Sequence, residues 1–223
     1  MRMTSTTTTD PAAPASSEPT PFARSVVGIV AFSRTIAAVR YAEDAGKAPR
    51  LDARLALLRM SAEAVASCEE ARRLGASAGI DPDEAAASYM GALGEVDERL
   101  HPLDWSERLV KTYIAIGLLS DFAGALVDEL DGGLSAGLRA VIGADDFGAF
   151  ASSELMGDLD ADPLLAGRLG LWGRRVVGEE IGTFRRLQAE RPVLLTGGAS
   201  SDGLHEVLSE GATTRMRSLG LRV

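Results

Sequence analysis

The chain has 223 residues, enough for one domain with a substantial core, and its 32 acidic and 23 basic residues give a net charge of −9. This balance argues against a nucleic-acid-binding protein with a broad basic surface, although a local basic patch is compatible with it. The single cysteine, Cys68, excludes an intrachain disulfide and fits a reducing cytoplasm. Ala, Leu and Gly dominate and β-branched runs are scarce, which favours helices.

Residues 1–21 are predicted to form a disordered tail, and residues 22–223 a single domain. The tail is rich in Ser, Thr, Pro and Ala and lacks the apolar core of a signal peptide. No segment combines the length and the uninterrupted apolar character that a membrane span needs. We therefore expect a cytoplasmic protein with no membrane partner.

The first part of the domain predicts three helices. Residues 22–45 have a wide apolar surface, with Arg34 in the middle of it. A second helix is predicted at residues 52–76, with Leu58 and Val65 on its core face. A turn then leads into a third helix that is predicted to end near residue 100.

Residues 104–130 are predicted to form the central helix of the bundle. Asp104 and Glu107 have the spacing of a capping box at its start. Between residues 109 and 119 the segment is apolar on nearly every side, which is typical of a helix buried all round. Asp121 projects from the same stripe as core residues, so the partner of this carboxylate becomes the main functional question.

Three more helices are predicted at residues 134–156, 164–190 and 204–219, and Asp145 and Glu180 lie on inward-facing stripes of the first two. The second of these helices also carries five arginines, mostly opposite its core stripe. These are Arg168, Arg174, Arg175, Arg185 and Arg186. They are predicted to form a solvated face, and a phosphate-, RNA- or partner-binding strip is the alternative. Six or seven helices joined by short turns predict an all-α bundle.

Short groups of residues along most of the chain carry a resemblance to a known family. They are Ala42 to Ala45, Glu98-Arg99, Pro102, Asp104-Trp105, Leu109 to Lys111, Tyr113, Gly117, Asp121-Phe122, Asp162-Pro163, Ala166 to Leu169, Leu171-Trp172, Arg174-Arg175 and Val177 to Glu179. From about residue 22 to residue 195 the chain resembles actinobacterial ferritin-like proteins of the MiaE-like family, which are related to the tRNA isopentenyladenosine hydroxylases. The resemblance implies a ferritin-like helical bundle.

The histidines of the chain fit a di-iron site poorly. A di-iron carboxylate site typically takes one Glu from each of two helices and a Glu-x-x-His motif from each of two others. His101 and His205 are the only histidines. Glu98 and His101 match Glu-x-x-His literally, but they stand at a predicted helix end, and His205 follows a glycine-rich loop.

Alignment with the MiaE-like family places other residues at the family's metal ligands. Arg34 stands where the first helix has a Glu, Ala64 and Ser67 fall on the Glu-x-x-His of the second helix, and Phe147 and Ala149 lie near the His and Glu of the fifth. We therefore expect no metal, no cofactor and no catalytic residue.

These expectations predict a non-catalytic protein that acts through an unidentified protein partner or through self-association. The alternative is an oxygen-dependent di-iron hydroxylase of the tRNA-modifying type with unusual ligands, for which di-iron would be the cofactor and tRNA a partner. A small-molecule site in the vacated space is a third interpretation.

Arg34, Asp121, Asp145 and Glu180 are predicted to form an interior polar cluster at the vacated metal site. Because unpaired charges are costly to bury, Arg34 is expected to neutralise one or two of these acids. Replacing Arg34 with Met would then lower the free energy of unfolding by about 3–5 kcal/mol. Two other interpretations are that these side chains lie at solvated edges of their stripes, or that the acids alone hold one metal ion.

Overall fold

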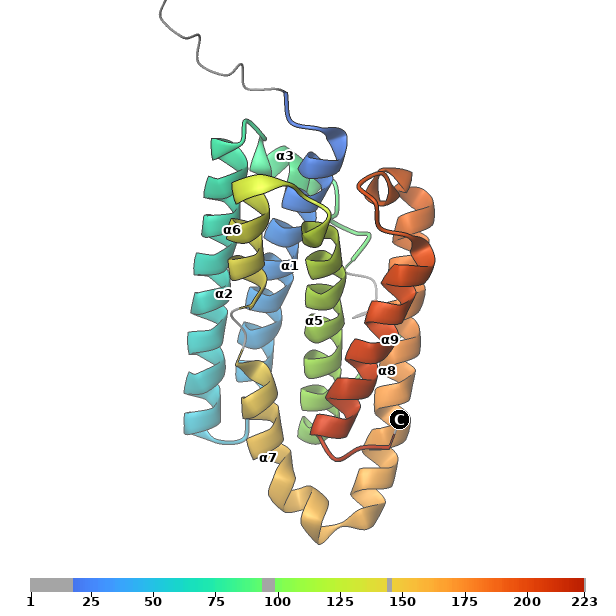
Figure 1. Cartoon of the computed structure of the whole chain (residues 1–223). Helices are drawn as coiled ribbons and strands as arrows, with labels where there is room; N and C mark the ends of the chain where they lie inside the picture. Colours follow the sequence, from blue (N-terminus) through green and yellow to red (C-terminus); the bar gives the residue numbers. More distant parts are fainter. Residues whose placement is uncertain (1–17, 94–98, 144–145, 223) are drawn as a thin grey trace, which may run out of the picture.

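A computed structural model of the chain describes residues 18–93, 99–143 and 146–222. These residues form a bundle of long helices and contain no strand, which confirms the prediction of an all-α bundle (Figure 1). The predicted tail falls mainly on residues 1–17, which lie outside the described residues.

Two long helices, α1 (Pro21–Ala45) and α2 (Leu51–Ser77), pack side by side along one side of the bundle. α1 begins where the Thr20 hydroxyl accepts a hydrogen bond from a backbone N–H of the first turn. The bounds of both helices agree with the predicted segments within one residue. Leu58 and Val65 are exposed rather than part of the core, because α2 packs on the bundle with a narrower face than the sequence pattern indicates.

The third helix is shorter than predicted. α3 spans only Pro82–Ala87, and the chain after it forms turns in which Gly91 adopts a positive φ of 93°. A left-handed residue ends a helix, and glycine adopts this conformation without a steric penalty. The rest of the predicted helix includes residues 94–98, which lie outside the described residues.

The predicted central helix is confirmed as α5 (Trp105–Asp128). The carboxylate of Asp104 accepts a hydrogen bond from the Glu107 backbone N–H at 2.9 Å, and the Glu107 side chain accepts one from the Leu103 N–H at 2.8 Å. This is the predicted reciprocal cap, except that it closes one residue earlier than a standard capping box.

The segment predicted as a single helix at 134–156 forms two helices, α6 (Gly132–Gly143) and α7 (Phe147–Ala161). Gly143 is the last residue of α6, and residues 144–145, which follow it, lie outside the described residues. α8 (Pro163–Glu190) is capped by Asp162 and is followed by a short 3-10 turn (Pro192–Leu195) and by α9 (Ser201–Ser218).

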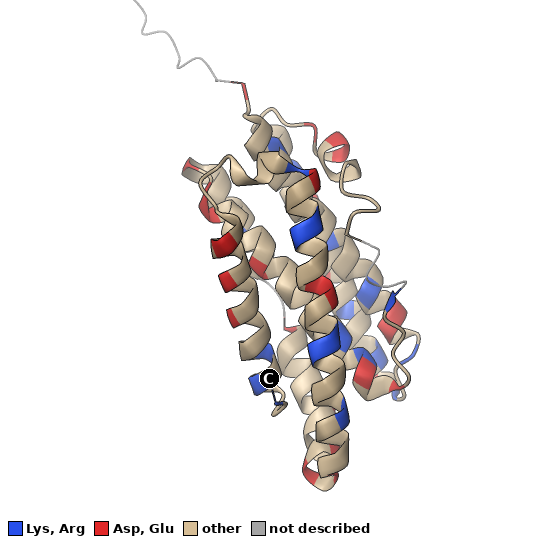
Figure 2. Ribbon diagram, turned by 90° about the vertical axis from the view of Figure 1, so that its right-hand side faces the viewer, with Lys and Arg blue, Asp and Glu red and all other residues tan. Residues whose placement is uncertain are grey.

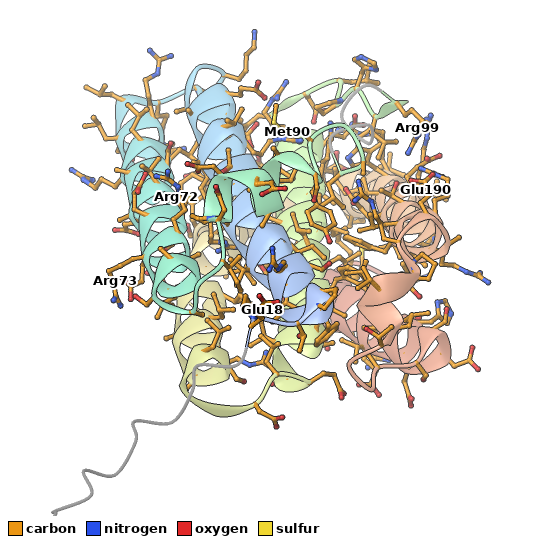
Figure 3. The ribbon with its side chains drawn as sticks, turned by 90° about the horizontal axis from the view of Figure 1, so that it is seen from above. Glu18, Arg72, Arg73, Met90, Arg99 and Glu190 are labelled. Atoms are coloured by element: carbon orange, nitrogen blue, oxygen red, sulfur yellow. The ribbon has the colours of Figure 1, made fainter. Side chains whose placement is uncertain are left out.

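α5 lies at the centre of this arrangement. Seen from above, it lies between α1 and α8 (Figure 3), and in Figure 1 α9 passes along one side of it and α6 and α7 along the other. Its core side chains are fully buried, and the Phe122 ring stacks on Phe184 of α8 with 4.8 Å between ring centroids. Every other long helix except α2 therefore packs directly on α5.

By length and composition alone, α1 and α5 are each apolar enough to cross a membrane. This corrects the sequence argument, which excluded such segments on the same criteria. In α1, 61% of the apolar window is buried inside the bundle, and in α5, 72%. The core helices of a soluble protein pass the same test.

Candidate functional site

A cluster of buried charges joins α1 to α5. Asp44 is fully buried near the end of α1 and accepts hydrogen bonds from the Thr112 hydroxyl at 2.6 Å and from the Arg108 guanidinium at 3.1 Å. Arg40 lies one turn earlier and is also buried. Burial raises the pKa of the Asp44 carboxyl, while the hydrogen bonds from Thr112 and Arg108 lower it and only partly compensate.

Glu180 of α8 faces this cluster from the other side. Burial raises the pKa of Glu180 to about 7, although the positive charges of Arg40, Lys111 and Arg99 act in the opposite direction. Glu180 and Arg40 line a cavity of about 20 Å³ whose other walls are apolar. A space of this size holds about one water molecule.

Lys111 of α5 completes the cluster. Its ammonium group donates a hydrogen bond to the Leu100 carbonyl at 2.5 Å, and burial lowers its pKa to about 8. Asp44 and Glu180 raise this pKa, while Arg40 and Arg108 lower it. The cluster of Arg40, Asp44, Lys111 and Glu180 therefore mixes both signs of charge in the interior of the bundle; we refer to it below as the core charge cluster.

Of the arginines predicted to form a solvated face on α8, Arg168 forms ion pairs. It binds Asp104 at 2.6 Å and Glu107 at 2.5 Å, which ties α8 to the beginning of α5. Acidic and basic positions alternate along α8, so the helix does not present a strip of one sign (Figure 2).

The predicted pair between Arg34 and Asp121 does not form. Asp121 makes a two-pronged ion pair with Arg215 of α9, at 2.5 and 2.9 Å, whereas Arg34 donates a hydrogen bond to the Ser120 hydroxyl at 2.8 Å. Successive residues of a helix point in different directions, so Arg34, which reaches Ser120, does not also reach the carboxylate of Asp121.

The four predicted cluster residues therefore do not share one site in the described part of the chain. Glu180 belongs to the core charge cluster, Asp121 to the α5–α9 contact and Arg34 to the α1–α5 contact. Asp145 lies outside the described residues. The sequence analysis missed Arg40 and Asp44, although they are four residues apart on one helix face and could have been identified as a local pair.

A cleft of about 690 Å³ opens between α5, α6, α7 and α9. Its floor is the face of α5 that includes Gly117, Ser120 and Asp121. A Cβ atom on Gly117 would lie 1.8 Å from the Arg215 side chain, and one on Gly211 of α9 would lie 1.9 Å from the Asp121 carboxylate. The two glycines thus make room for the ion pair that closes one wall of the cleft.

Comparison with known families decides the fold type. Residues 21–197 match the family described as "Ferritin-like domain, actinomycetes". The chain belongs to this ferritin-like family. The match covers most of the chain and confirms the expectation of a ferritin-like bundle, and no curated protein matches the chain. α9 lies beyond the matched residues, so the helix that supplies Arg215 and one wall of the cleft is outside the shared domain.

The described residues do not fit the di-iron ligand set of ferritin-like enzymes. His101 and His205 are exposed, and no three His, Cys, Asp or Glu side chains gather as metal ligands in the described part of the chain. Asp44 and Asp121 are hydrogen-bonded to arginines, and Glu180 lies near Arg40 and Lys111. Fixed cations beside a carboxylate oppose the binding of a metal cation to it.

Proposed function

We propose that this chain is a ferritin-like protein that acts by binding a partner rather than by di-iron chemistry, and that it is a relative of the MiaE-like hydroxylases without their ligands. The observation that supports this most directly is the core charge cluster. Arg40 and Lys111 supply positive charge beside Asp44 and Glu180, the charge that metal ions provide in a ferritin-like enzyme. The alternative is a di-iron hydroxylase of the tRNA-modifying type, and the iron content of the purified protein distinguishes the two.

Protein produced in iron-supplemented medium is expected to be folded and to contain far less than one iron ion per chain. Metal content is measured by inductively coupled plasma mass spectrometry and folding by circular dichroism. About two iron ions per chain, as a di-iron enzyme holds, would contradict the proposal if the Glu180→Gln variant loses them. Glu179→Gln is the matched control, because Glu179 pairs with Arg99 at the surface and does not face the core charge cluster.

The partner that the surface favours is a second copy of the chain. An apolar stripe on the outer side of α2 consists of Leu51, Leu55, Leu58, Ala62 and Val65, all exposed. Leu51 is 70% exposed, Leu58 45% and Val65 50%. Their alternating spacing of four and three residues is the spacing at which two helices interlock in a coiled coil.

The charges beside this stripe are compatible with a two-fold dimer. An axis near Leu58 places Leu55 opposite Ala62 and Arg54 opposite Glu63 of the second copy, and the reverse pair forms by symmetry. Farther along α2, Arg73 points outwards and pairs with Glu70, and Arg72 pairs with Asp83 of α3, so charged side chains follow the apolar surface (Figure 3). We therefore propose dimerisation through α2.

Replacing Leu58 with Glu is expected to raise the dissociation constant of this dimer at least about a hundredfold. The residue lies at the proposed axis, so two leucines lose their burial, each worth about 1.5–3 kcal/mol. Analytical ultracentrifugation over a concentration series measures the constant. Leu171→Glu on α8 is the control and should leave the dissociation constant unchanged, since Leu171 is also an exposed leucine but lies on another helix, away from the stripe. A wild-type chain that stays monomeric at every concentration would contradict the dimer.

We also propose a cytoplasmic location and no nucleic-acid partner for the metal-free protein. The net charge of −9 and the alternating charges of α8 support the second statement, because backbone phosphates attract a surface of consistently positive sign (Figure 2). The single cysteine is compatible with a reducing compartment.

A further inference from the structure

Arg34 carries a buried positive charge that the described fold does not neutralise. The side chain is 2% exposed, and its hydrogen bond to the Ser120 hydroxyl leaves the Nε atom buried without a partner. Among residues 18–93, 99–143 and 146–222, no carboxylate forms an ion pair with it. A guanidinium keeps its charge at every physiological pH, so burial in this state is costly to the fold.

The hydrogen bond of Arg34 connects it to the cleft between α5, α6, α7 and α9. Ser120, which accepts that bond, lies on the floor of the cleft. A hydroxyl that accepts a bond from a guanidinium still has its own proton to donate. Ser120 can therefore present a donor to a molecule in the cleft, with the positive charge of Arg34 directly behind it.

Two more arginines line the cleft. Arg215 of α9 is held against Asp121, and Arg139 of α6 pairs with Asp128 and donates a hydrogen bond to the Gly124 carbonyl at 2.8 Å. These contacts fix both guanidinium groups in place. Counting Arg34 behind Ser120, three arginines surround this region, and the acids that line the cleft are Asp121, Asp146 and Glu210.

The rest of the lining combines apolar walls with an acidic rim. Ile116, Ile142 and Phe147 supply apolar surface, whereas Asp146 and Glu210 are exposed. The volume of about 690 Å³ is within the range of sites for small organic ligands. The acids at the exposed rim disfavour large polyanions, and the arginines together with the apolar walls suit a ligand with a single anionic group on an apolar body.

We propose that this cleft binds a small organic anion, a carboxylate or a phosphate monoester, with its anionic group at Ser120 and its apolar body against Ile116 and Ile142. Arg34 supplies the buried positive charge through the Ser120 hydroxyl, and Arg139 and Arg215 provide direct donors at the walls. The inference goes beyond the proposed function, because the dimer stripe on α2 and the cleft are separate surfaces and either can fail alone.

Isothermal titration calorimetry on the full chain tests this with four probes: phenyl phosphate, benzoate, inorganic phosphate and benzyl alcohol. At least one of the two aromatic anions is expected to bind, and benzyl alcohol to bind at least about tenfold more weakly, because it lacks the charge. Inorganic phosphate is expected to bind more weakly than phenyl phosphate, since it lacks the apolar body. Equal affinity for benzyl alcohol, or no binding of either aromatic anion, would overturn the proposal.

Three variants connect the binding to Arg34. Arg34→Met is expected to weaken binding of the anionic probe at least about tenfold, while its melting temperature stays level or rises. Arg139→Gln is expected to weaken binding too, without removing a buried charge from the core. Arg185→Met, at an exposed arginine of α8, is the matched control and should bind as the wild type does. Unchanged affinity in Arg34→Met, or a sharp fall in its melting temperature, would contradict the role of Arg34, and unchanged affinity in Arg139→Gln would contradict the role of Arg139.

Discussion

Replacing Asp44 with Ala is expected to lower the free energy of unfolding by about 3–5 kcal/mol. Asp44 is fully buried, and its carboxylate receives hydrogen bonds from Thr112 and Arg108 while Arg40 lies buried nearby. Removing the acid takes away the nearby negative charge that acts most strongly on the buried Arg40, and it leaves the Thr112 hydroxyl without its acceptor. Both losses fall on groups that cannot reach bulk water in the folded state.

Chemical unfolding in urea at pH 7, followed by circular dichroism, measures this effect. Asp52→Ala is the control: Asp52 is an exposed acid on α2 beside Arg50, and its loss should change stability by less than about 0.5 kcal/mol. A loss below about 1 kcal/mol for Asp44→Ala would mean that water or a shift of neighbouring side chains replaces the carboxylate. The core charge cluster would then not be a structural element of the bundle.

The long helices could be predicted because their signals are local. α1, α5 and α8 follow from apolar patterns with a cap or a proline at the start, as at Asp104 for α5 and Asp162 for α8, and α2 follows from its apolar pattern alone. The errors fall where a glycine interrupts a favourable pattern. Gly91 follows the early end of α3, and Gly143 ends α6 inside a segment that reads as one continuous stripe.

The candidate site was harder to predict, because a charge in an apolar pattern reveals burial but not its partner. Arg34 and Asp121 are both identifiable as unusual from the sequence alone. The partner of Asp121 comes from α9, 94 residues later, and depends on how that helix crosses α5. The expected effect of Arg34→Met on the free energy of unfolding therefore changes. Because no acid in the described part of the chain pairs with Arg34, removing this buried charge leaves no acid unpaired and is neutral or stabilising rather than destabilising.

A dependence on pH is expected from Glu180. Its pKa is raised from 4.5 to about 7 in the folded protein, mainly by burial, so between these values the folded state keeps a proton that the unfolded chain has released. The contribution of Glu180 to stability is therefore largest below pH 4.5 and is lost as the pH rises towards 7. At about 1.4 kcal/mol per pH unit, the full loss is about 3 kcal/mol.

The Glu180→Gln variant isolates this contribution, because an amide resembles the protonated acid and does not titrate. Urea unfolding of both proteins at pH 5 and pH 8 gives the difference in stability between them at each pH. The wild type is expected to lose about 2–3 kcal/mol more than the variant across this interval, whatever other groups contribute to both proteins. Parallel stability profiles would show that Arg40 and Lys111 offset the cost of burying the charge, and that Glu180 is ionised throughout as a partner in an interior ion pair.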